Sequence, residues 1–196
     1  MILDIKESAQ LYIKNMQLLE KANTGLVIID VQEKLMPVVE RSQIIIENIK
    51  KLLLLSKLFH LPVILTEQYS KWLGPTLPDI IESLTEYKPI PKMHFNCCAV
   101  ENFNEQLNSK DFKNIIVAGV ESHICVFQTC VSLVNKGYKV HIPRDAVGSR
   151  TDENSSVGLK LANKAGAYIT STESVIYQIL EKAGTKEFKQ MLKKVK

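Results

Sequence analysis

Six short apolar runs, separated by segments with helical spacing, constrain the fold of this chain more than any other feature. The runs at 25–30 (GLVIID) and 114–120 (NIIVAGV) are almost wholly apolar, as expected for strands that are buried on both faces of a sheet. Because neighbouring strands that run in the same direction need a crossover, the alternation predicts one α/β domain. We expect a central, mostly parallel six-stranded sheet with helices on both faces, layered as in a Rossmann fold. The other four runs lie at 61–67, 89–95, 138–143 and 167–172.

The length of 196 residues fits a single domain that spans 1–196. Residues 1–22 predict an N-terminal helical segment, and residues 185–196 predict a basic C-terminal helix. The stretch at 68–80 (QYSKWLGPTLPDI) is the longest that we expect to be irregular, and it is a candidate pocket wall. Helices are expected between the strands, at 37–59, 98–108, 124–136 and 152–165.

The C-terminal segment 185–196 contains five Lys and one Glu, so it accounts for the whole net charge of +4. Apolar residues at 188, 191, 192 and 195 indicate an amphipathic helix that packs on the domain. We do not expect nucleic acid as a partner, because no basic and aromatic interleaving or RNA-reading motif occurs elsewhere. No run is long enough to cross a membrane, and the first residues mix charges of both signs, unlike a signal peptide. These features predict a cytoplasmic protein with reduced thiols.

Three residues with complementary chemistry follow three different predicted strands. Asp30 ends the first, Lys92 lies in the third, and Cys125 follows the fourth at the start of a predicted helix. Sites in such sheets form where the carboxyl ends of the strands meet. A helix N-terminus and a nearby ammonium both favour a thiolate, and a carboxylate in reach can take up the thiol proton. Each residue alone is more often structural, and only their joint placement predicts a nucleophilic site.

Four motifs resemble those of the isochorismatase-like cysteine hydrolases, a superfamily that includes isochorismatases, nicotinamidases and N-carbamoylsarcosine amidases. They are LVIIDVQ, VILTEQ, PKMHFNC and GVESHICV, in that order, and the resemblance that rests on them covers nearly the whole chain after Thr24. The nearest likeness is to the small isochorismatase-domain proteins of uncertain substrate. The resemblance implies that Asp30 is the acid/base, Lys92 the triad lysine and Cys125 the nucleophile.

The resemblance also implies an oxyanion hole next to the nucleophile. In the family, the peptide bond that corresponds to Val120–Glu121 is cis. It directs the N–H of the residue in the place of Glu121 toward the oxyanion, beside the N–H of the nucleophilic cysteine. We therefore expect Val120, Glu121 and Cys125 to form this part of the site.

Five further side chains are candidates for substrate binding. Gln32 matches a family residue that supports the first motif, and Glu67 ends the second strand. Tyr69 and Trp72 lie in the irregular stretch and are plausible apolar pocket walls. His123 precedes the nucleophile by two residues and lines either the turn or a subunit interface. For Tyr69 and Trp72, packing over the sheet edge is an equal alternative.

The chain departs from the metal-binding relatives at two positions. Gln68 and Ser70 stand where metal-binding nicotinamidases carry Asp and His, and neither is a good ligand for zinc or iron. Neighbouring cysteines at 97 and 98 do not easily reach one tetrahedral centre either. The sequence therefore predicts a site with no metal and no cofactor.

These features together predict a metal-independent hydrolase of a small molecule. The expected bond is the C–N bond of an amide or carbamoyl group, opened through a thioester on Cys125. One alternative is an isochorismatase-type hydrolysis of a vinyl ether. Another is a non-catalytic or nucleic-acid-acting protein that uses its basic C-terminal tail. The resemblance also implies a homo-oligomer, either a dimer or a tetramer.

Overall fold

The computed structural model describes residues 18–195 of the chain. Most of the predicted N-terminal helical segment, 1–22, lies outside these residues. The part that is described contains one 3₁₀ turn, η1 (Lys21–Asn23). Within residues 18–195, no helix is long and apolar enough to cross a membrane.

A parallel sheet forms the centre of the domain, in the strand order β3-β2-β1-β4-β5-β7. A seventh strand, β6, pairs with β4 outside this path. The predicted α/β fold is thus confirmed, and the prediction of six strands was wrong by one because β6 is only two residues long. The strands are β1 (Thr24–Ile29), β2 (Val63–Gln68), β3 (Ile90–Lys92), β4 (Asn114–Val120), β5 (Lys139–Pro143), β6 (Val147–Gly148) and β7 (Tyr168–Thr170).

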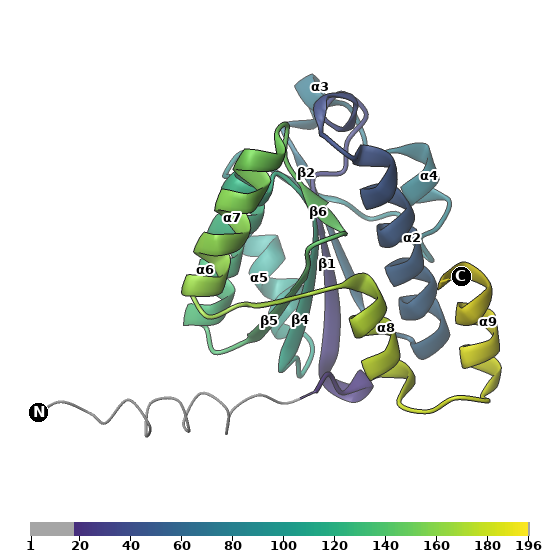
Figure 1. Cartoon of the computed structure of the whole chain (residues 1–196). Coiled ribbons are helices and arrows are strands. Elements are labelled where there is room, and N and C mark those ends of the chain that lie inside the picture. The colour runs from purple at the N-terminus through teal and green to yellow at the C-terminus, as the bar shows by residue number, and fades with distance from the viewer. Residues whose placement is uncertain (1–17, 196) are drawn as a thin grey trace, which may run out of the picture.

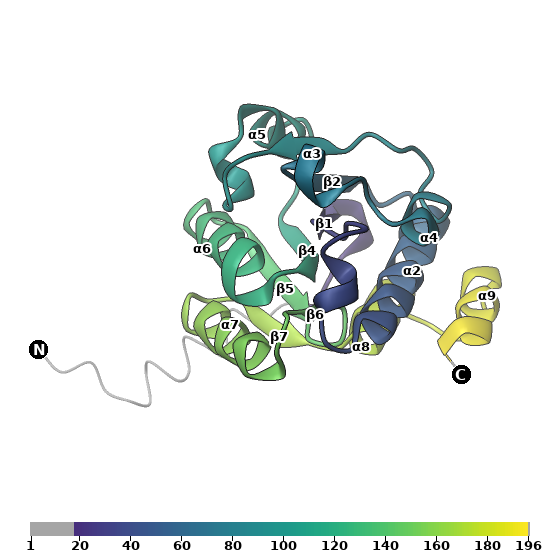
Figure 2. The same cartoon turned by 90° about the horizontal axis from the view of Figure 1, so that it is seen from above.

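Helices cover both faces of the sheet (Figures 1 and 2). One face carries α2 (Ser42–Phe59), α4 (Pro78–Ile81), α8 (Thr172–Leu180) and α9 (Lys186–Val195). The other carries α5 (Glu101–Asn108), α6 (Phe127–Asn135) and α7 (Asp152–Lys164). The short helix α3 (Ser70–Leu73) lies above the end of β2 (Figure 1). Three short turns complete the list: η2 (Met36–Val38), η3 (Cys97–Ala99) and η4 (Ser122–Val126).

The sheet separates two apolar cores. Successive residues of β1 alternate between them: Leu26 and Ile28 pack toward α2, whereas Val27 and Ile29 pack toward α5 and α6. Because successive side chains of a strand point to opposite faces, a strand covered on both sides must be apolar throughout. This is the physical reason for the uninterrupted apolar runs in the sequence.

Two predicted helices begin differently from the prediction. The helix expected from residue 37 is a 3₁₀ turn, η2, and α2 begins only at Ser42, after Arg41 in the left-handed region with φ of 57°. The helix expected at 124–136 is divided into η4, a turn of π-helix, and α6. The stretch expected to be irregular contains the two short helices α3 and α4.

Candidate active site

The candidate site lies where the connections after two neighbouring strands leave toward opposite faces of the sheet. β1 leads into α2 on one face, and β4 leads through η4 into α6 on the other. Such a reversal opens a crevice at the carboxyl edge of a parallel sheet. Asp30 directly follows β1, Lys92 ends β3, and Cys125 lies in η4. The topology therefore brings all three predicted residues to one edge.

Asp30 turns its carboxylate inward from the end of β1. Its backbone is left-handed, with φ of 57°, a conformation that aspartate tolerates better than most residues. The side chain is fully buried. Its Oδ2 accepts a hydrogen bond from Lys92 Nζ at 2.6 Å, and its Oδ1 accepts one from Thr66 Oγ1 at 2.8 Å. Burial raises the pKa of Asp30, against the opposing effects of the Lys92 ammonium and of the Thr66 hydroxyl.

Lys92 is held by three oxygen acceptors. Its ammonium donates to Asp30 Oδ2 at 2.6 Å, to Gln68 Oε1 at 2.6 Å and to the His94 carbonyl at 3.3 Å. An ammonium has three N–H bonds, so this set uses all of them. Burial lowers the pKa of Lys92, but the Asp30 carboxylate and the nearby thiols outweigh burial and raise it. The side chain is thus a fixed, buried positive charge.

Cys125 is buried beside this ion pair. Burial, the charge of Asp30 and a hydrogen bond with Asp30 raise the pKa of the thiol, while Lys92 acts in the opposite direction. The sequence predicts a thiolate favoured by Lys92 and by a helix N-terminus. In the structure, burial outweighs the effect of Lys92 and favours the protonated thiol. Asp30, whose pKa is also raised, is placed to accept that proton.

The turn between β4 and η4 brings two backbones very close together. The Val120–Glu121 peptide bond is cis. Gly119, with φ of 113°, leaves no room for a side chain, because a Cβ there would lie 2.1 Å from the Ile29 carbonyl oxygen. Only glycine accommodates both this backbone angle and this approach of β4 to β1.

Glu121 and His123 belong to a polar cluster that faces the loop before α7. Glu121 is buried, and its Oε1 lies 2.8 Å from Arg150 Nε. His123 Nδ1 lies 3.0 Å from Ser149 Oγ and 3.6 Å from Glu121 Oε2. These contacts direct both side chains toward Ser149 and Arg150. Only the backbone of Glu121 therefore remains available to contact a group bound near Cys125.

Gln32 fastens the candidate pocket wall instead of facing the crevice. Its Nε2 donates to the carbonyls of Gln68 at 3.0 Å and Gly74 at 2.7 Å, and its Oε1 accepts from the Gln68 N–H at 2.8 Å. The side chain is fully buried. Gln68 in turn bonds Lys92 and donates from Nε2 to the Met93 carbonyl at 2.9 Å. Sequence reasoning missed this role of Gln68; its position, directly after Glu67 at the end of β2, was the available signal.

Glu67 holds the same wall by its carboxylate. It accepts hydrogen bonds from the Thr76 N–H at 2.7 Å, the Thr76 hydroxyl at 2.8 Å, the Tyr87 hydroxyl at 2.6 Å and the Ser70 hydroxyl at 3.0 Å. Burial raises the pKa of Glu67, but these bonds outweigh burial and lower it. The carboxylate is therefore fully engaged with protein groups.

Tyr69 and Trp72 lie at the surface, Tyr69 directly before α3 and Trp72 within it. Their exposed fractions are 46% and 70%. Met93 and Phe95, which follow β3 along the chain, are similarly exposed. Tyr69 and Met93 help to line a cavity of about 350 Å³ that also includes Ser70, Lys71, Pro91 and Lys92. Tyr69 thus lies beside β3, with its N–H 2.9 Å from the Lys92 carbonyl oxygen in donor-to-acceptor distance, whereas Trp72 does not line this cavity.

The other three cysteines are free thiols in different surroundings. Cys97 is buried with its sulfur 3.9 Å from Thr66 Oγ1, Cys98 is half-buried, and Cys130 lies on the buried face of α6. Across residues 18–195, no three His, Cys, Asp or Glu side chains are grouped as metal ligands would be.

The chain is similar in sequence and in structure to several known proteins. Residues 24–174 match the isochorismatase domain. The chain is 37% identical over 175 residues to the secreted isochorismatase effector Isc1 of Phytophthora sojae, covering 87% of this chain and 83% of that protein. The MAR1 ribonuclease of Caenorhabditis elegans has a similar structure, with a TM-score of 0.85, 32% identity and coverage of 91% and 92%. The fold is also that of YcaC from Escherichia coli, described as an octameric hydrolase of unknown specificity, with a TM-score of 0.86, 22% identity and coverage of 91% of both chains.

Proposed function

The chain belongs to the isochorismatase family, whose members are hydrolases, and from this premise we propose that it hydrolyses a C–N bond of a small amide or carbamoyl compound through Cys125. One observation carries the proposal. A fully buried ion pair, Asp30 and Lys92, lies beside a buried thiol at the carboxyl edge of the sheet. A buried pair contributes little net stability, whereas displaced pKa values around a thiol suit covalent catalysis.

Asp30 is the base of the first step. It takes the proton from the Cys125 thiol as the sulfur attacks the carbonyl carbon, and a tetrahedral oxyanion forms. The raised pKa of Asp30 makes it a stronger base than an ordinary aspartate. Lys92 keeps its three protons throughout, and its fixed charge offsets the negative charge shared by Asp30 and the sulfur. The N–H groups of Glu121 and Cys125 are the proposed donors to the oxyanion.

Asp30 is the acid of the second step. It returns the proton to the leaving nitrogen as the C–N bond breaks, which leaves a thioester on Cys125 and frees ammonia or an amine. Asp30 then removes a proton from water, the hydroxide displaces the sulfur, and the carboxylic acid or carbamate leaves. The thiol regains its proton, so the cycle closes without any other reactant.

We propose that the reaction needs no metal ion. The two side chains at the positions of the relatives' metal ligands are already bound within the protein. Gln68 bonds Lys92 and the Met93 carbonyl, and the Ser70 hydroxyl donates to Glu67. Tyr69 and Trp72 are the proposed apolar contacts of the substrate, with Gln32 and Glu67 holding that wall in place and His123 lining the turn.

Alkylation of individual cysteines tests the proposal. Iodoacetamide labelling at pH 7, followed by mass spectrometry, should modify Cys125 faster than the half-buried Cys98. Asp30→Asn should slow labelling of Cys125, and turnover of a panel of simple amides, by about 100-fold or more, because the base is lost. Asp111→Asn, an exposed aspartate, is the matched control and should change neither. Equal labelling of Cys125 in the parent and in Asp30→Asn would contradict the mechanism.

Hydrolysis of a vinyl ether is the alternative within the family, and it needs the acid but no sulfur nucleophile. A Cys125→Ser variant separates the two reactions. It should lose the amide reaction, whereas a protein that only protonates a vinyl ether through Asp30 would keep its turnover.

Action on RNA is a second candidate, favoured by two observations. A structural neighbour with 32% identity is named a ribonuclease. The helix α9 presents four exposed lysines at 186, 189, 193 and 194, while Met191 packs inward. Binding of labelled RNA should then fall steeply with salt and should weaken in the double variant Lys189→Glu, Lys193→Glu. The matched change away from α9, Lys110→Glu with Lys113→Glu at two other exposed lysines, should leave it unaltered. Salt-independent or absent binding would exclude this function.

We propose that the protein acts as a homo-oligomer in the cytoplasm, on a small-molecule substrate. The octamer described for YcaC supports assembly, and four free thiols suit a reducing compartment. Analytical ultracentrifugation tests the first proposal and fractionation of expressing cells tests the second.

A further inference from the structure

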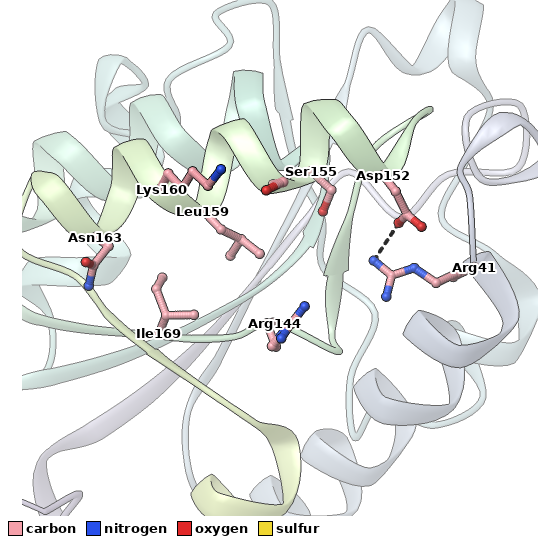
Figure 3. Close-up of a pocket in the computed structure, with 9 residues that line it drawn as sticks. Arg41, Arg144, Asp152, Ser155, Leu159, Lys160, Asn163 and Ile169 are labelled. Carbon is pink, nitrogen blue, oxygen red and sulfur yellow. Dashed lines mark ion pairs between the residues drawn. The ribbon is translucent and has the colours of Figure 1, made fainter.

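A second cavity lies against α7, away from the thiol. Its volume is about 520 Å³, and neither Asp30, Lys92 nor Cys125 lines it. Residues of one face of α7, at positions 152, 155, 156, 159, 160 and 163, form its upper wall (Figure 3). Their spacing of three and four residues keeps them on one side of the helix. Arg41, Arg144 and Ile169 close the cavity from the other elements.

The cavity has an excess of positive charge. Three cationic side chains line it, Arg41, Arg144 and Lys160, together with one carboxylate, Asp152. Asp152 is already used, because its Oδ1 lies 2.7 Å from Arg41 Nη2. Within residues 18–195, no carboxylate forms an ion pair with Arg144 or with Lys160. In this part of the chain, two positive charges at the cavity are therefore left without an acidic partner.

The remaining lining combines hydrogen-bonding groups with an apolar floor. Ser156 offers a hydroxyl, and Asn163 lines the cavity while its Nδ2 donates to the Ala167 carbonyl at 3.1 Å. The buried Ser155 also lines it, with its Oγ 3.5 Å from Ser122 Oγ. Leu159 points away from α7 toward Ile169, and the Arg144 guanidinium lies on the same side of the helix (Figure 3). A ligand that fits these surroundings carries a compact anion at one end and an apolar body at the other.

We propose that this cavity binds a phosphate monoester with a small apolar or aromatic body. A phosphate monoester has a charge near −2 at neutral pH, which matches the two unpaired cations. The guanidinium of Arg144 can donate two parallel hydrogen bonds to phosphate oxygens, and Lys160 adds a point charge. The apolar body then covers Leu159 and Ile169. A monocarboxylate would leave one positive charge unmatched and should bind more weakly.

Isothermal titration calorimetry with phenyl phosphate tests the site. Arg144→Gln should weaken binding by about tenfold or more, because a hydrogen bond between charged groups is lost. Lys160→Gln should weaken it severalfold. Lys164→Gln is the matched control, since Lys164 is exposed on the same helix and does not line the cavity. Its affinity should equal that of the parent.

Three parallel titrations distinguish recognition of the phosphate from general binding of an aromatic ring or an anion. Benzyl alcohol and benzoate should both bind much more weakly than phenyl phosphate. The Cys125→Ser variant should bind phenyl phosphate as the parent does, whether or not the proposed hydrolase activity exists. No measurable binding, equal binding by Arg144→Gln, or competition between phenyl phosphate and alkylation of Cys125 would each overturn the proposal. Absence of binding in an oligomer that buries Arg144 would assign the cavity to a subunit interface and overturn it as well.

Discussion

Replacing Lys92 by methionine should show how the buried ion pair affects the free energy of unfolding. The Lys92 and Asp30 side chains have no exposed area, and Nζ and Oδ2 are 2.6 Å apart. Methionine fills much the same volume without the charge, so Asp30 is left buried and uncompensated. Losing one partner of a buried pair typically destabilises a protein by about 3–5 kcal/mol. We expect this loss in the free energy of unfolding at pH 7.

The loss should depend on pH in a defined direction. Without Lys92, the pKa of Asp30 rises further above its unfolded value of about 3.9. A carboxyl group whose pKa is higher in the folded than in the unfolded protein stabilises the fold at a pH below its unfolded pKa. This stabilisation is lost as the pH rises through its folded pKa. The maximum slope is about 1.4 kcal/mol per pH unit. Between pH 5 and pH 7 the variant should therefore lose up to about 2.7 kcal/mol in total, and this loss should be larger than that of the parent.

Urea unfolding at pH 5, 6 and 7 measures both effects. The double variant Asp30→Asn, Lys92→Met has no buried charge, so its stability at pH 7 should exceed that of Lys92→Met alone. Lys88→Met is a matched surface control, because Lys88 and Glu86 are also 2.6 Å apart but largely exposed. It should cost less than about 1 kcal/mol. Equal destabilisation of Lys92→Met at pH 5 and pH 7, with a double variant that is no more stable, would show that Asp30 is not left as an uncompensated buried charge.

Three further changes test other parts of the structure. Gln68→Leu should lower the free energy of unfolding by about 1–3 kcal/mol, since the Lys92 ammonium and the Met93 carbonyl each lose a hydrogen-bond partner. Urea unfolding measures this loss, with Gln43→Leu, a change at an exposed glutamine, as the control. His141 is buried and its pKa is lowered to about 4, so its neutral form stabilises the fold above about pH 6.5 and up to about 3 kcal/mol is lost as the pH falls to 4. His141→Phe should lack that acid sensitivity in urea titrations from pH 7 to pH 4, and an unchanged profile would contradict the assignment. Gly119→Ala should reduce the thermal midpoint sharply or prevent folding, because its Cβ meets the Ile29 carbonyl oxygen, whereas Gly184→Ala, with open space around it, should cost no more than its positive φ requires.

The sheet could be predicted because its strands are covered on both faces. In a chain whose apolar runs alternate with helical segments, an apolar run such as 114–120 predicts a strand buried on both faces. The strand β4 has those bounds. The convergence of Asp30, Lys92 and Cys125 follows from the same rule, since each residue is attached to a strand end. The short strand β6 and the helix α8 were not predicted: β6 has two residues, and up to residue 195 no strand follows α8 along the chain.

The electrostatics of the site could not be predicted from the sequence. Whether a thiol is acidic depends on how deeply the surrounding loops bury it, and burial reverses the expected direction for Cys125. The partners of Glu67 are likewise unpredictable, because Tyr87 lies 20 residues away and reaches it only once the wall is folded. The third acceptor of Lys92, the His94 carbonyl, depends on the backbone path after β3.

The attachment of the pocket wall has a consequence for how this enzyme scaffold can diversify. Two side chains help to hold segment 69–87 on the domain, Gln32 at Gly74 and Glu67 at Thr76 and Tyr87, together with backbone hydrogen bonds such as that from the Leu77 N–H to the Val31 carbonyl. None of these contacts involves Asp30 or Cys125. A replacement segment that keeps the acceptor and donors at those points would form a new wall over an unchanged reactive centre. In the proposed hydrolase, substrate range and reaction chemistry can therefore change separately, and grafting segment 69–87 from a relative tests this separation.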